Sequence, residues 1–403
     1  LIRITHDNTG KPDHLQQLKQ INFDENRTDM DCPPHFWGGW VGYVGYDAAW
    51  LFENLPDRSK KRLNIPDIYF MQVERLAVYD HKTGILKYIV SPEMANYDHL
   101  AGEIHDVWKR IHSADLQSET NVRLPREHTA TSLKSNTTKS GYMDMVKRVK
   151  RYIANGDIYQ ANIAQQFEMD FMGDPFQLYL QLRDINPSPF SGYLKFADLA
   201  LVSSSPERLL KLDEKLLETR PIAGTRPRGK TPDEDRQLTQ DLLLNEKEKA
   251  EHLMLVDLER NDLGRICEYG SVRVSDLMFV EKYSHVTHIV SNILGTLAPD
   301  VTILDILQAV FPGGTITGCP KIRCMEIIDE LEPSCRGPYS GSFGYIGWSK
   351  YMDLNIIIRT IIVKNHKACF HVGAGIVADS DPENEYNETL AKAAAMIEVL
   401  GGH

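Results

Sequence analysis

The clearest hydrophobic periodicity in the chain lies within residues 142–153. Apolar side chains recur there at intervals of three and four, with lysine and arginine between them: Tyr142, Met145, Val146, Val149, Tyr152 and Ile153. This spacing places the apolar side chains on one face of a helix and the basic ones on the opposite face. Asn155 and Gly156 follow, and both residue types favour the turn that ends a helix. We therefore predict an amphipathic helix that ends near residue 155.

The next stretch, residues 157–168, has a different period. In "GDIYQANIAQQF", residues 156–167, apolar positions alternate with Gln160 and Asn162, and Gln165 and Gln166 follow. Alternation at every second residue predicts a half-buried strand. Neutral amides are unusual on the solvated face of a strand, where threonine, lysine or glutamate is more common. The amides therefore indicate that something is hydrogen-bonded here by groups that carry no charge.

Further strand patterns and helical patterns cover most of the chain. Strands are predicted within 37–50, 67–80, 86–91, 191–196, 199–204, 208–213, 342–348, 354–364 and 367–378, and helices at 243–260 and after residue 381. Strands and helices do not alternate regularly, which favours an α+β fold over a doubly wound sheet. A segment rich in Ser, Thr and Asn predicts a surface linker. We expect an N-terminal portion (1–112), this linker (113–140) and a C-terminal portion that carries the chemistry (141–403).

Composition narrows the class of protein. The chain has 403 residues, 42% of them hydrophobic, and a formal net charge of −11. The acidic balance argues against a general binder of nucleic acid or anionic membranes, and no apolar run approaches the roughly 20 residues of a membrane span. The six cysteines are scattered without a Cys-x-x-Cys pair, which argues against a zinc site or disulfide framework. We expect a cytoplasmic globular protein and, from its size, an enzyme.

Acidic residues near the C-terminus form the first candidate site. In "ADSDPENEYNETLAKAAAM", residues 378–396, the spacing of Glu385, Glu388 and Lys392 places them on one face of a helix. One interpretation is a solvated face with an ion pair inside the helix. The other is a site for a hard cation such as Mg²⁺, because two acids one turn apart suit such an ion. The residues alone leave both interpretations open.

Other candidates lie elsewhere in the chain. The helix predicted at 243–260 carries Glu251 among apolar positions on more than one side, so its acids need partners if it is buried. Arg359 lies in the apolar stretch "LNIIIRTIIV", where a guanidinium must find an anion or many acceptors. Two turns rich in glycine and threonine, at 221–229 and 311–321, offer backbone N–H groups that suit carboxylates as well as phosphates, and residues 373–377 are a third glycine-rich element. His288 has no metal-like context, and a core histidine is its simplest interpretation.

These motifs occur in an order that is specific to one family. The strings are "GDIYQANIAQQF", "SSSPERLL", "RPIAGTRPRG", "EKAEHLMLVDLERNDLGR", "GGTITGCPKIRCMEIIDELEP", "IIIRT" and "GAGIVADSDPENEYNET", and "GGWVGYVGYD" and "ENLP" precede them. Together they resemble the chorismate-utilising synthases. The resemblance implies one intertwined α+β unit in which two β-sheets pack as a sandwich with helices outside. It also implies Mg²⁺-dependent chemistry on chorismate.

The resemblance assigns a role to each matching residue. It implies that Glu251 and Glu388 bind Mg²⁺, with Glu385 close by, and that the metal holds the ring carboxylate. Glu207 resembles the general acid that protonates the departing C4 hydroxyl, a step worth about 10²–10⁴-fold in rate. The resemblance also implies that His288 is a catalytic residue that lies against the ring. The substrate-binding residues that it implies are Gly224, Thr225 and Thr315 at the ring, Tyr339, Arg359, Gly373, Ala374 and Gly375 at the enolpyruvyl carboxylate, and Lys392 as added positive charge.

Gln160 indicates which reaction to expect. Relatives that add water at C2 place a lysine base at this position, whereas ammonia is already nucleophilic and needs no base. The neutral amide therefore favours amination. Because nothing in the sequence resembles a glutaminase site, we expect a separate glutamine amidotransferase subunit to supply the ammonia. A chorismate-binding subunit without turnover is a remote alternative, against which the retained acids argue.

Two aminated products remain open. "YQANIAQQF" and "NPSPFSGYL" resemble the folate-pathway enzymes that make 4-amino-4-deoxychorismate. The tryptophan-pathway enzymes that make anthranilate more often have a valine-rich strand and a "PSPYMF"-like segment. Ala223 argues the other way, because many of the folate-pathway enzymes have a lysine there that is proposed to attack C2. We predict 4-amino-4-deoxychorismate, with anthranilate as the alternative.

Overall fold

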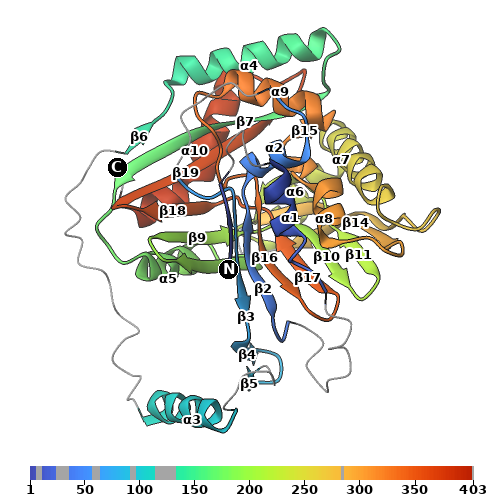
Figure 1. Ribbon diagram of the computed structural model, residues 1–403. Coiled ribbons are helices and arrows are strands. Elements are labelled where there is room, and N and C mark those ends of the chain that lie inside the picture. The colour runs from blue at the N-terminus through green and yellow to red at the C-terminus, as the bar shows by residue number, and fades with distance from the viewer. Residues whose placement is uncertain are drawn as a thin grey trace.

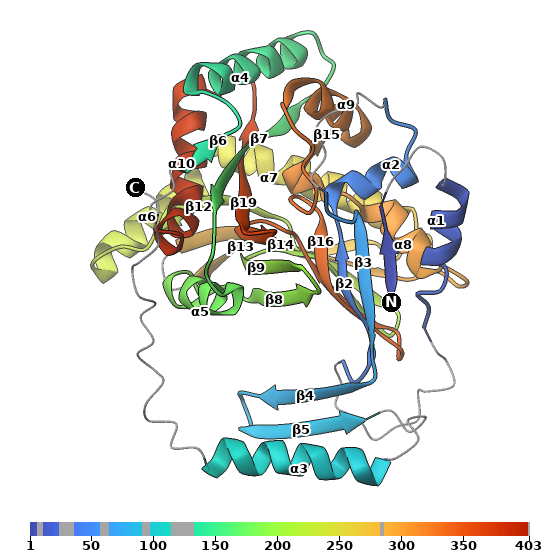
Figure 2. The same ribbon diagram turned by 60° about the vertical axis from the view of Figure 1, so that its left-hand side comes forward.

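The computed structural model describes residues 1–5, 11–23, 36–56, 64–90, 97–113, 133–282 and 286–401. Two large antiparallel sheets form the centre of this part of the chain (Figures 1 and 2). The first contains, in spatial order, β1 (Ile2–Ile4), β3 (Ile68–Val73), β2 (Gly39–Val44), β16 (Ser342–Gly347), β17 (Tyr351–Asn355), β10 (Arg208–Asp213), β11 (Leu216–Thr219), β14 (Val286–Thr296) and β12 (Ile222–Pro227), with β13 (Arg273–Lys282) also paired to β14.

The second large sheet is built from the middle and the end of the chain. In spatial order it contains β15 (Gly318–Cys319), β7 (Gln160–Asp170), β19 (Lys367–Ile376), β18 (Thr360–Lys364), β9 (Leu199–Ser205) and β8 (Phe190–Phe196), with β6 (Lys134–Ser135) also paired to β7. A separate hairpin joins β4 (Arg75–Asp80) to β5 (Ile85–Val90).

Helices lie outside the sheets. They are α1 (Lys11–Leu18), α2 (Ala49–Phe52), α3 (Tyr97–Ser113), α4 (Lys139–Ala154), α5 (Pro175–Ile185), α6 (Pro232–Leu244), α7 (Glu246–Gly264), α8 (Ile303–Val310), α9 (Lys321–Leu331) and α10 (Pro382–Val399), with short 3₁₀ turns η2 (Tyr46–Ala48) and η4 (Gly314–Ile316). Within the described part of the chain, none of these helices combines the length and apolarity needed to cross a bilayer.

Apolar side chains from both sheets meet in a shared core. Tyr43 and Tyr69 of the first sheet pack with Phe196 and Leu201 of the second, and the ring of Tyr69 stacks on Phe196 with centroids 4.3 Å apart. On the outer face of the second sheet, side chains of α5 and α10 form another apolar cluster with strand residues such as Phe370. The predicted sandwich with external helices is therefore confirmed.

The N-terminal strands are part of the same unit as the C-terminal ones. Residues of β2 pair with β16 over six positions, from Ser342 opposite Val44 to Gly347 opposite Gly39. This pairing confirms the intertwined fold. The division at residues 113–140 stays a prediction, because 114–132 lie outside the described residues. At the end of that segment, β6 already pairs with β7, and α4 begins at Lys139.

Two strand predictions were wrong in ways that matter for the site. The stretch predicted as one strand at 354–364 is two: β17 ends at Asn355 in the first sheet, and β18 begins at Thr360 in the second. The residues between them cross from one sheet to the other. The strand at 157–168 is β7, but it is buried on both faces rather than one, because it lies inside the sheet with β19 on one side and helix α4 packed on it.

Smaller differences concern element boundaries. The predicted amphipathic helix is α4, and its C-cap is Asn155 as expected. The glycine-aromatic stretch 37–50 forms a strand only as far as Val44, because the chain then turns into η2 and α2. Helix α7 was predicted, whereas α6, directly before it, was not. The last helix is capped by Asp381, whose carboxylate accepts the backbone N–H groups of Glu383 and Asn384.

Candidate active site

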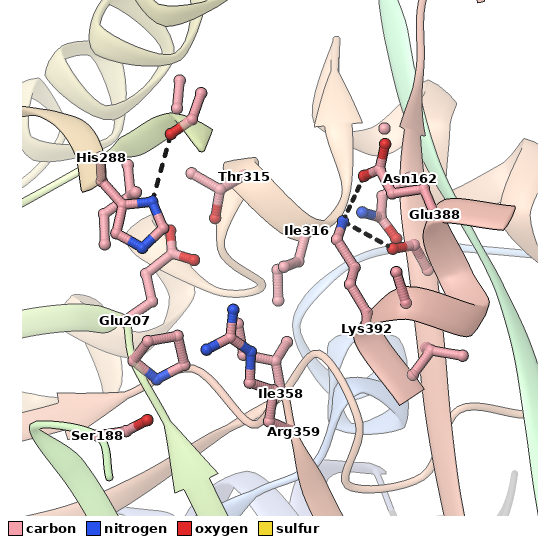
Figure 3. Close-up of a pocket in the computed structure, with 18 of the residues that line it drawn as sticks. Asn162, Ser188, Glu207, His288, Thr315, Ile316, Ile358, Arg359, Glu388 and Lys392 are labelled. Atoms are coloured by element: carbon pink, nitrogen blue, oxygen red, sulfur yellow. Dashed lines mark hydrogen bonds and ion pairs between the residues drawn. The ribbon is translucent and has the colours of Figure 1, made fainter. Parts of the chain in front are cut away.

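A cavity of about 740 Å³ is lined by residues of both sheets and of helices α7 and α10. Its wall contains most of the candidate residues: Gln160, Glu207, Gly224, Glu251, His288, Thr315, Tyr339, Arg359, Gly373, Gly375, Glu385, Glu388 and Lys392. Figure 3 shows several of them pointing into one space from different elements. The structure does not place the side chains of two other candidates in this wall. Ala374 does not line the cavity, because its methyl group points into the apolar core, and the side chain of Thr225 lies outside the described residues.

The crossover between the sheets delivers Arg359 to this cavity. Arg359 has a φ of 48°, a left-handed conformation that is unfavourable for a residue with a side chain and persists only where the surroundings enforce it. Here the backbone carbonyl of Arg359 accepts the N–H of Ser204 at 3.1 Å. Burial lowers the pKa of the guanidinium, and nearby Glu207 opposes that shift. The sharp turn between β17 and β18 thus aims a positive charge into the cavity.

Glu207 follows β9 by two residues and is 8% exposed. Burial raises the pKa of its carboxyl to about 7, while the Thr315 hydroxyl and the charges of Arg359 and Lys392 act in the opposite direction. A carboxyl with a pKa near 7 is protonated for much of the time at neutral pH and can serve as a general acid. Its location at the cavity wall makes that proton available to a ligand (Figure 3).

His288, on β14, lies beside Glu207 in Figure 3. Its Nδ1 is 3.3 Å from the carbonyl oxygen of Gly224. Because a carbonyl only accepts, this contact places a proton on Nδ1. Burial lowers the pKa of the ring, so His288 is neutral at physiological pH. Gly224 has a φ of 65°, which favours glycine, and a Cβ there would lie 2.7 Å from Leu242.

The acids of α7 and α10 face the same space from two sides. Glu251 accepts a hydrogen bond of 3.0 Å from Nε2 of Gln160. Glu388 pairs with Lys392 at 2.7 Å, and Lys392 also donates to the carbonyl of Gly373 at 3.1 Å. Glu385 is buried at the cavity wall. The intrahelical ion pair of the simpler interpretation therefore exists, but both of its members also line the cavity.

These carboxylates fit a loosely held Mg²⁺. Within the described residues, no three His, Cys, Asp or Glu side chains are close enough to form a complete metal cage. Mg²⁺ usually binds one or two carboxylates and completes its octahedron with water and substrate oxygens. Glu251 and Glu388 supply hard oxygen ligands of that kind. The donor set therefore suits Mg²⁺ bound together with an anionic substrate.

Sequence reasoning missed a buried charged group behind the cavity. Arg336 is 1% exposed and pairs with Glu332, which is 4% exposed. Its remaining N–H groups bind the backbone carbonyls of Asn162 and Ile316 and the hydroxyl of Ser340. Its guanidinium lies over the rings of Tyr46 and Tyr339. The residues around Arg336 in the sequence are not strongly apolar, so no local pattern indicated its burial.

The sequence analysis also gave no role to two further residues of the cavity wall. His371 stacks on Tyr339 with ring centroids 5.2 Å apart, and burial lowers the pKa of its imidazole to about 3. Asn162 lines the cavity two residues after Gln160. The alternation of amides in "YQANIAQQF" was the signal for Asn162. His371 had no comparable signal, because β19 alternates there between residues of ordinary strand composition.

Comparisons with known proteins identify the family of this chain. The sequence profile of the family described as chorismate binding enzyme matches residues 2–398. Aminodeoxychorismate synthase component 1 of Bacillus subtilis (strain 168) is 46% identical over 370 residues, which cover 91% of this chain and 78% of that protein. Anthranilate synthase component 1 of Aquifex aeolicus (strain VF5) is 44% identical over 372 residues, covering 91% and 75%.

A solved structure shows the same fold. The crystal structure of anthranilate synthase component I from Streptococcus pneumoniae TIGR4 matches with a TM-score of 0.84 and 36% sequence identity, over 95% of this chain and 85% of that one. The predicted resemblance to chorismate-utilising synthases is therefore confirmed, and this chain belongs to the chorismate-binding enzyme family.

Proposed function

We propose that this chain aminates chorismate with ammonia to form 4-amino-4-deoxychorismate. The observation that carries the proposal is the neutral amide of Gln160, which lies in the same cavity as the buried acid Glu207. Addition of water to the ring requires a base at the attacking atom, whereas ammonia is already a nucleophile. A cavity with a buried acid and a neutral amide therefore suits amination better than hydration.

The charges of the cavity suit a dianionic substrate. We assign the enolpyruvyl carboxylate to Arg359, Tyr339 and the backbone of Gly373 and Gly375, with Lys392 adding positive charge. The carbonyl of Gly373 accepts from Lys392. In an antiparallel strand the N–H and C=O of one residue point the same way, so its N–H faces the cavity too. We place the ring between His288, Gly224, Thr225 and Thr315.

The second carboxylate of the substrate, on the ring, is assigned to the metal site. Glu251 and Glu388 would hold Mg²⁺, with Glu385 beside them, and when bound the ion supplies a Lewis acid for the ring carboxylate. Glu207 would donate its proton to the C4 hydroxyl, which leaves as water when its C–O bond breaks. The new C–N bond forms from the lone pair of ammonia, and the proton that the nitrogen then loses restores the carboxyl of Glu207 over the full cycle.

Anthranilate is the second candidate product because of Ala223. This residue is 6% exposed and lines the cavity, so the position faces the proposed substrate but offers only a methyl group. A covalent adduct through a lysine is therefore impossible at this position. The "NPSPF" segment favours 4-amino-4-deoxychorismate, and its residues Pro187, Ser188 and Pro189 line the same cavity.

Product analysis tests the choice between these products. The purified chain is incubated with chorismate, Mg²⁺ and an ammonium salt, and the product is identified by mass and fluorescence with a pyruvate assay in parallel. We expect 4-amino-4-deoxychorismate without pyruvate, because the enolpyruvyl group is retained. Fluorescent anthranilate with an equal amount of pyruvate would reverse the assignment, and consumption of chorismate without ammonium would argue against amination altogether.

A nitrogen-source comparison tests the partner. We propose that a separate glutamine amidotransferase supplies ammonia, because the two relatives described above are named component 1 and no glutaminase motif occurs in this sequence. The isolated chain is expected to use ammonium salts and to ignore glutamine. Rates are measured with each nitrogen source at equal concentration. Glutamine-dependent turnover by the isolated chain contradicts this prediction.

A further inference from the structure

Two amide oxygens in the cavity wall have no hydrogen-bond partner among the described residues, and a hydrogen bond fixes the orientation of one of these amides. Gln160 is 3% exposed and Asn162 is 7% exposed. Nε2 of Gln160 donates to Oε1 of Glu251 at 3.0 Å. Because a carboxylate only accepts, this bond fixes the orientation of the amide and leaves Oε1 of Gln160 without a hydrogen bond. Oδ1 of Asn162 likewise has none.

The backbone holds Asn162 firmly in place. Its N–H donates to the carbonyl of Thr317 at 3.0 Å, and its carbonyl accepts from Arg336 at 2.7 Å. Successive residues of a strand point to opposite faces, so Gln160 and Asn162 share one face of β7. The hydrogen bonds of the backbone therefore hold this part of β7 in place, and the two amides stand next to each other on one face of it.

Two glycines on the neighbouring strand make room for this pair. Gly375 lies opposite Asn162 in the ladder, and Gly373 lies opposite Ala164. A Cβ at Gly373 would lie 2.4 Å from Oδ1 of Asn162, and a Cβ at Gly375 would lie 2.7 Å from Nε2 of Gln160. Any side chain at either position would displace an amide. The glycines of β19 thus give the amides space as well as facing the proposed carboxylate.

We propose that the amide oxygens of Gln160 and Asn162 form the docking site for ammonia. The inference rests on the proposed amination. A buried acceptor that lacks a donor is costly, so this pair selects a ligand with several N–H or O–H groups. Ammonia has three N–H bonds, and two of them can go to the amide oxygens while the lone pair faces the substrate. Neutral amides neither protonate ammonia nor remove a proton from water.

The location of the pair suits an incoming nucleophile. In Figure 3, Asn162 lies on the side of the cavity formed by Lys392 and Glu388, whereas Glu207 and His288 lie across from it. A substrate held between these walls would present one side to the acid that releases the hydroxyl and the other to the amides. The nucleophile and the leaving group therefore occupy separate places.

Steady-state kinetics of Asn162→Val tests the docking site. Chorismate consumption is followed at fixed pH while ammonium is varied at saturating chorismate, and then chorismate is varied at saturating ammonium. We expect the KM for ammonium to rise about 2- to 10-fold, the range for loss of one neutral hydrogen bond. The KM for chorismate is expected to change less than about 2-fold. Asn162→Ala, which only removes atoms, is measured as well, with thermal unfolding of both variants.

Gln165→Leu is the matched control. Gln165 is an equally buried amide of β7, but it lies outside the cavity and both ends of its amide have partners, in Ser135 and Thr389. This variant is expected to lose thermal stability while keeping both KM values. An unchanged ammonium KM in both Asn162 variants overturns the docking site. A rise confined to the chorismate KM assigns the amides to the substrate instead. Failure of the unmodified chain to use ammonium would instead refute the proposed function.

Discussion

Glu207→Gln is expected to bind chorismate and to lose about 10²–10⁴-fold in kcat, the usual contribution of a positioned acid. Glutamine keeps the size and the hydrogen-bonding capacity of the side chain but has no proton to transfer. Chorismate binding is measured by calorimetry and turnover by chorismate consumption with ammonium. This result would also exclude a subunit that only binds chorismate, because such a subunit has no turnover to lose.

The pH dependence of kcat is a second test of Glu207 as the general acid. Because burial raises the pKa of Glu207 to about 7, the acid is protonated below that pH and ionised above it. The kcat of the unmodified chain is therefore expected to fall as the pH rises through about 7, and this basic limb should be absent from the residual activity of Glu207→Gln. Glu398→Gln, at an exposed site on α10, should change neither rate nor profile. Undiminished turnover in Glu207→Gln would remove this residue from the mechanism.

Arg336→Met is expected to lower the free energy of unfolding by about 3–5 kcal/mol, the cost of removing one partner of a buried ion pair. The variant leaves Glu332 as a buried charge, and it leaves the carbonyls of Asn162 and Ile316 without their donor. Urea denaturation, followed by circular dichroism and fluorescence together, measures the change and checks that the transition is two-state.

Two further variants test whether the loss of stability comes from the buried ion pair. Arg260→Met removes an exposed ion pair with Asp257 and should cost at most about 1 kcal/mol. The double variant Arg336→Met/Glu332→Leu should recover part of the loss, because the second substitution removes the uncompensated charge. A change for Arg336→Met as small as that for Arg260→Met would show that the buried pair contributes little to the free energy of unfolding.

The local sequence was sufficient to predict those helices and strands whose hydrophobic pattern is complete within the element itself. Helix α4 shows its period and its cap within sixteen residues, so its apolar face and its end were both predicted. The strands β8, β9 and β10 were predicted for the same reason. Helix α6 was missed, because it is rich in acids and polar residues and has a weak apolar stripe, so that little in its own sequence distinguishes it from a solvated loop.

The environment of a strand depends on what covers it. The alternation of residues 157–168 predicted a half-buried strand, yet β7 is buried on both faces, because α4, α9 and β19 pack around it, and α9 and β19 lie far along the chain. In the same way "LNIIIRTIIV" has one uninterrupted apolar pattern, and only the pairing of β17 with β10 and of β18 with β9 reveals that the chain changes sheets at Arg359.

The sequence by itself determined the family, the two-sheet α+β class and the residue types of the site, because these depend on ordered motifs and on short-range periodicity. The tertiary structure decided which of those residues share a cavity, that burial raises the pKa of Glu207 to about 7, and that Gln160 and Asn162 line the cavity with amide oxygens that lack a hydrogen bond. Burial and hydrogen-bond geometry depend on contacts between segments that lie far apart in the chain, such as Gln160 and Glu251, and no local pattern encodes them.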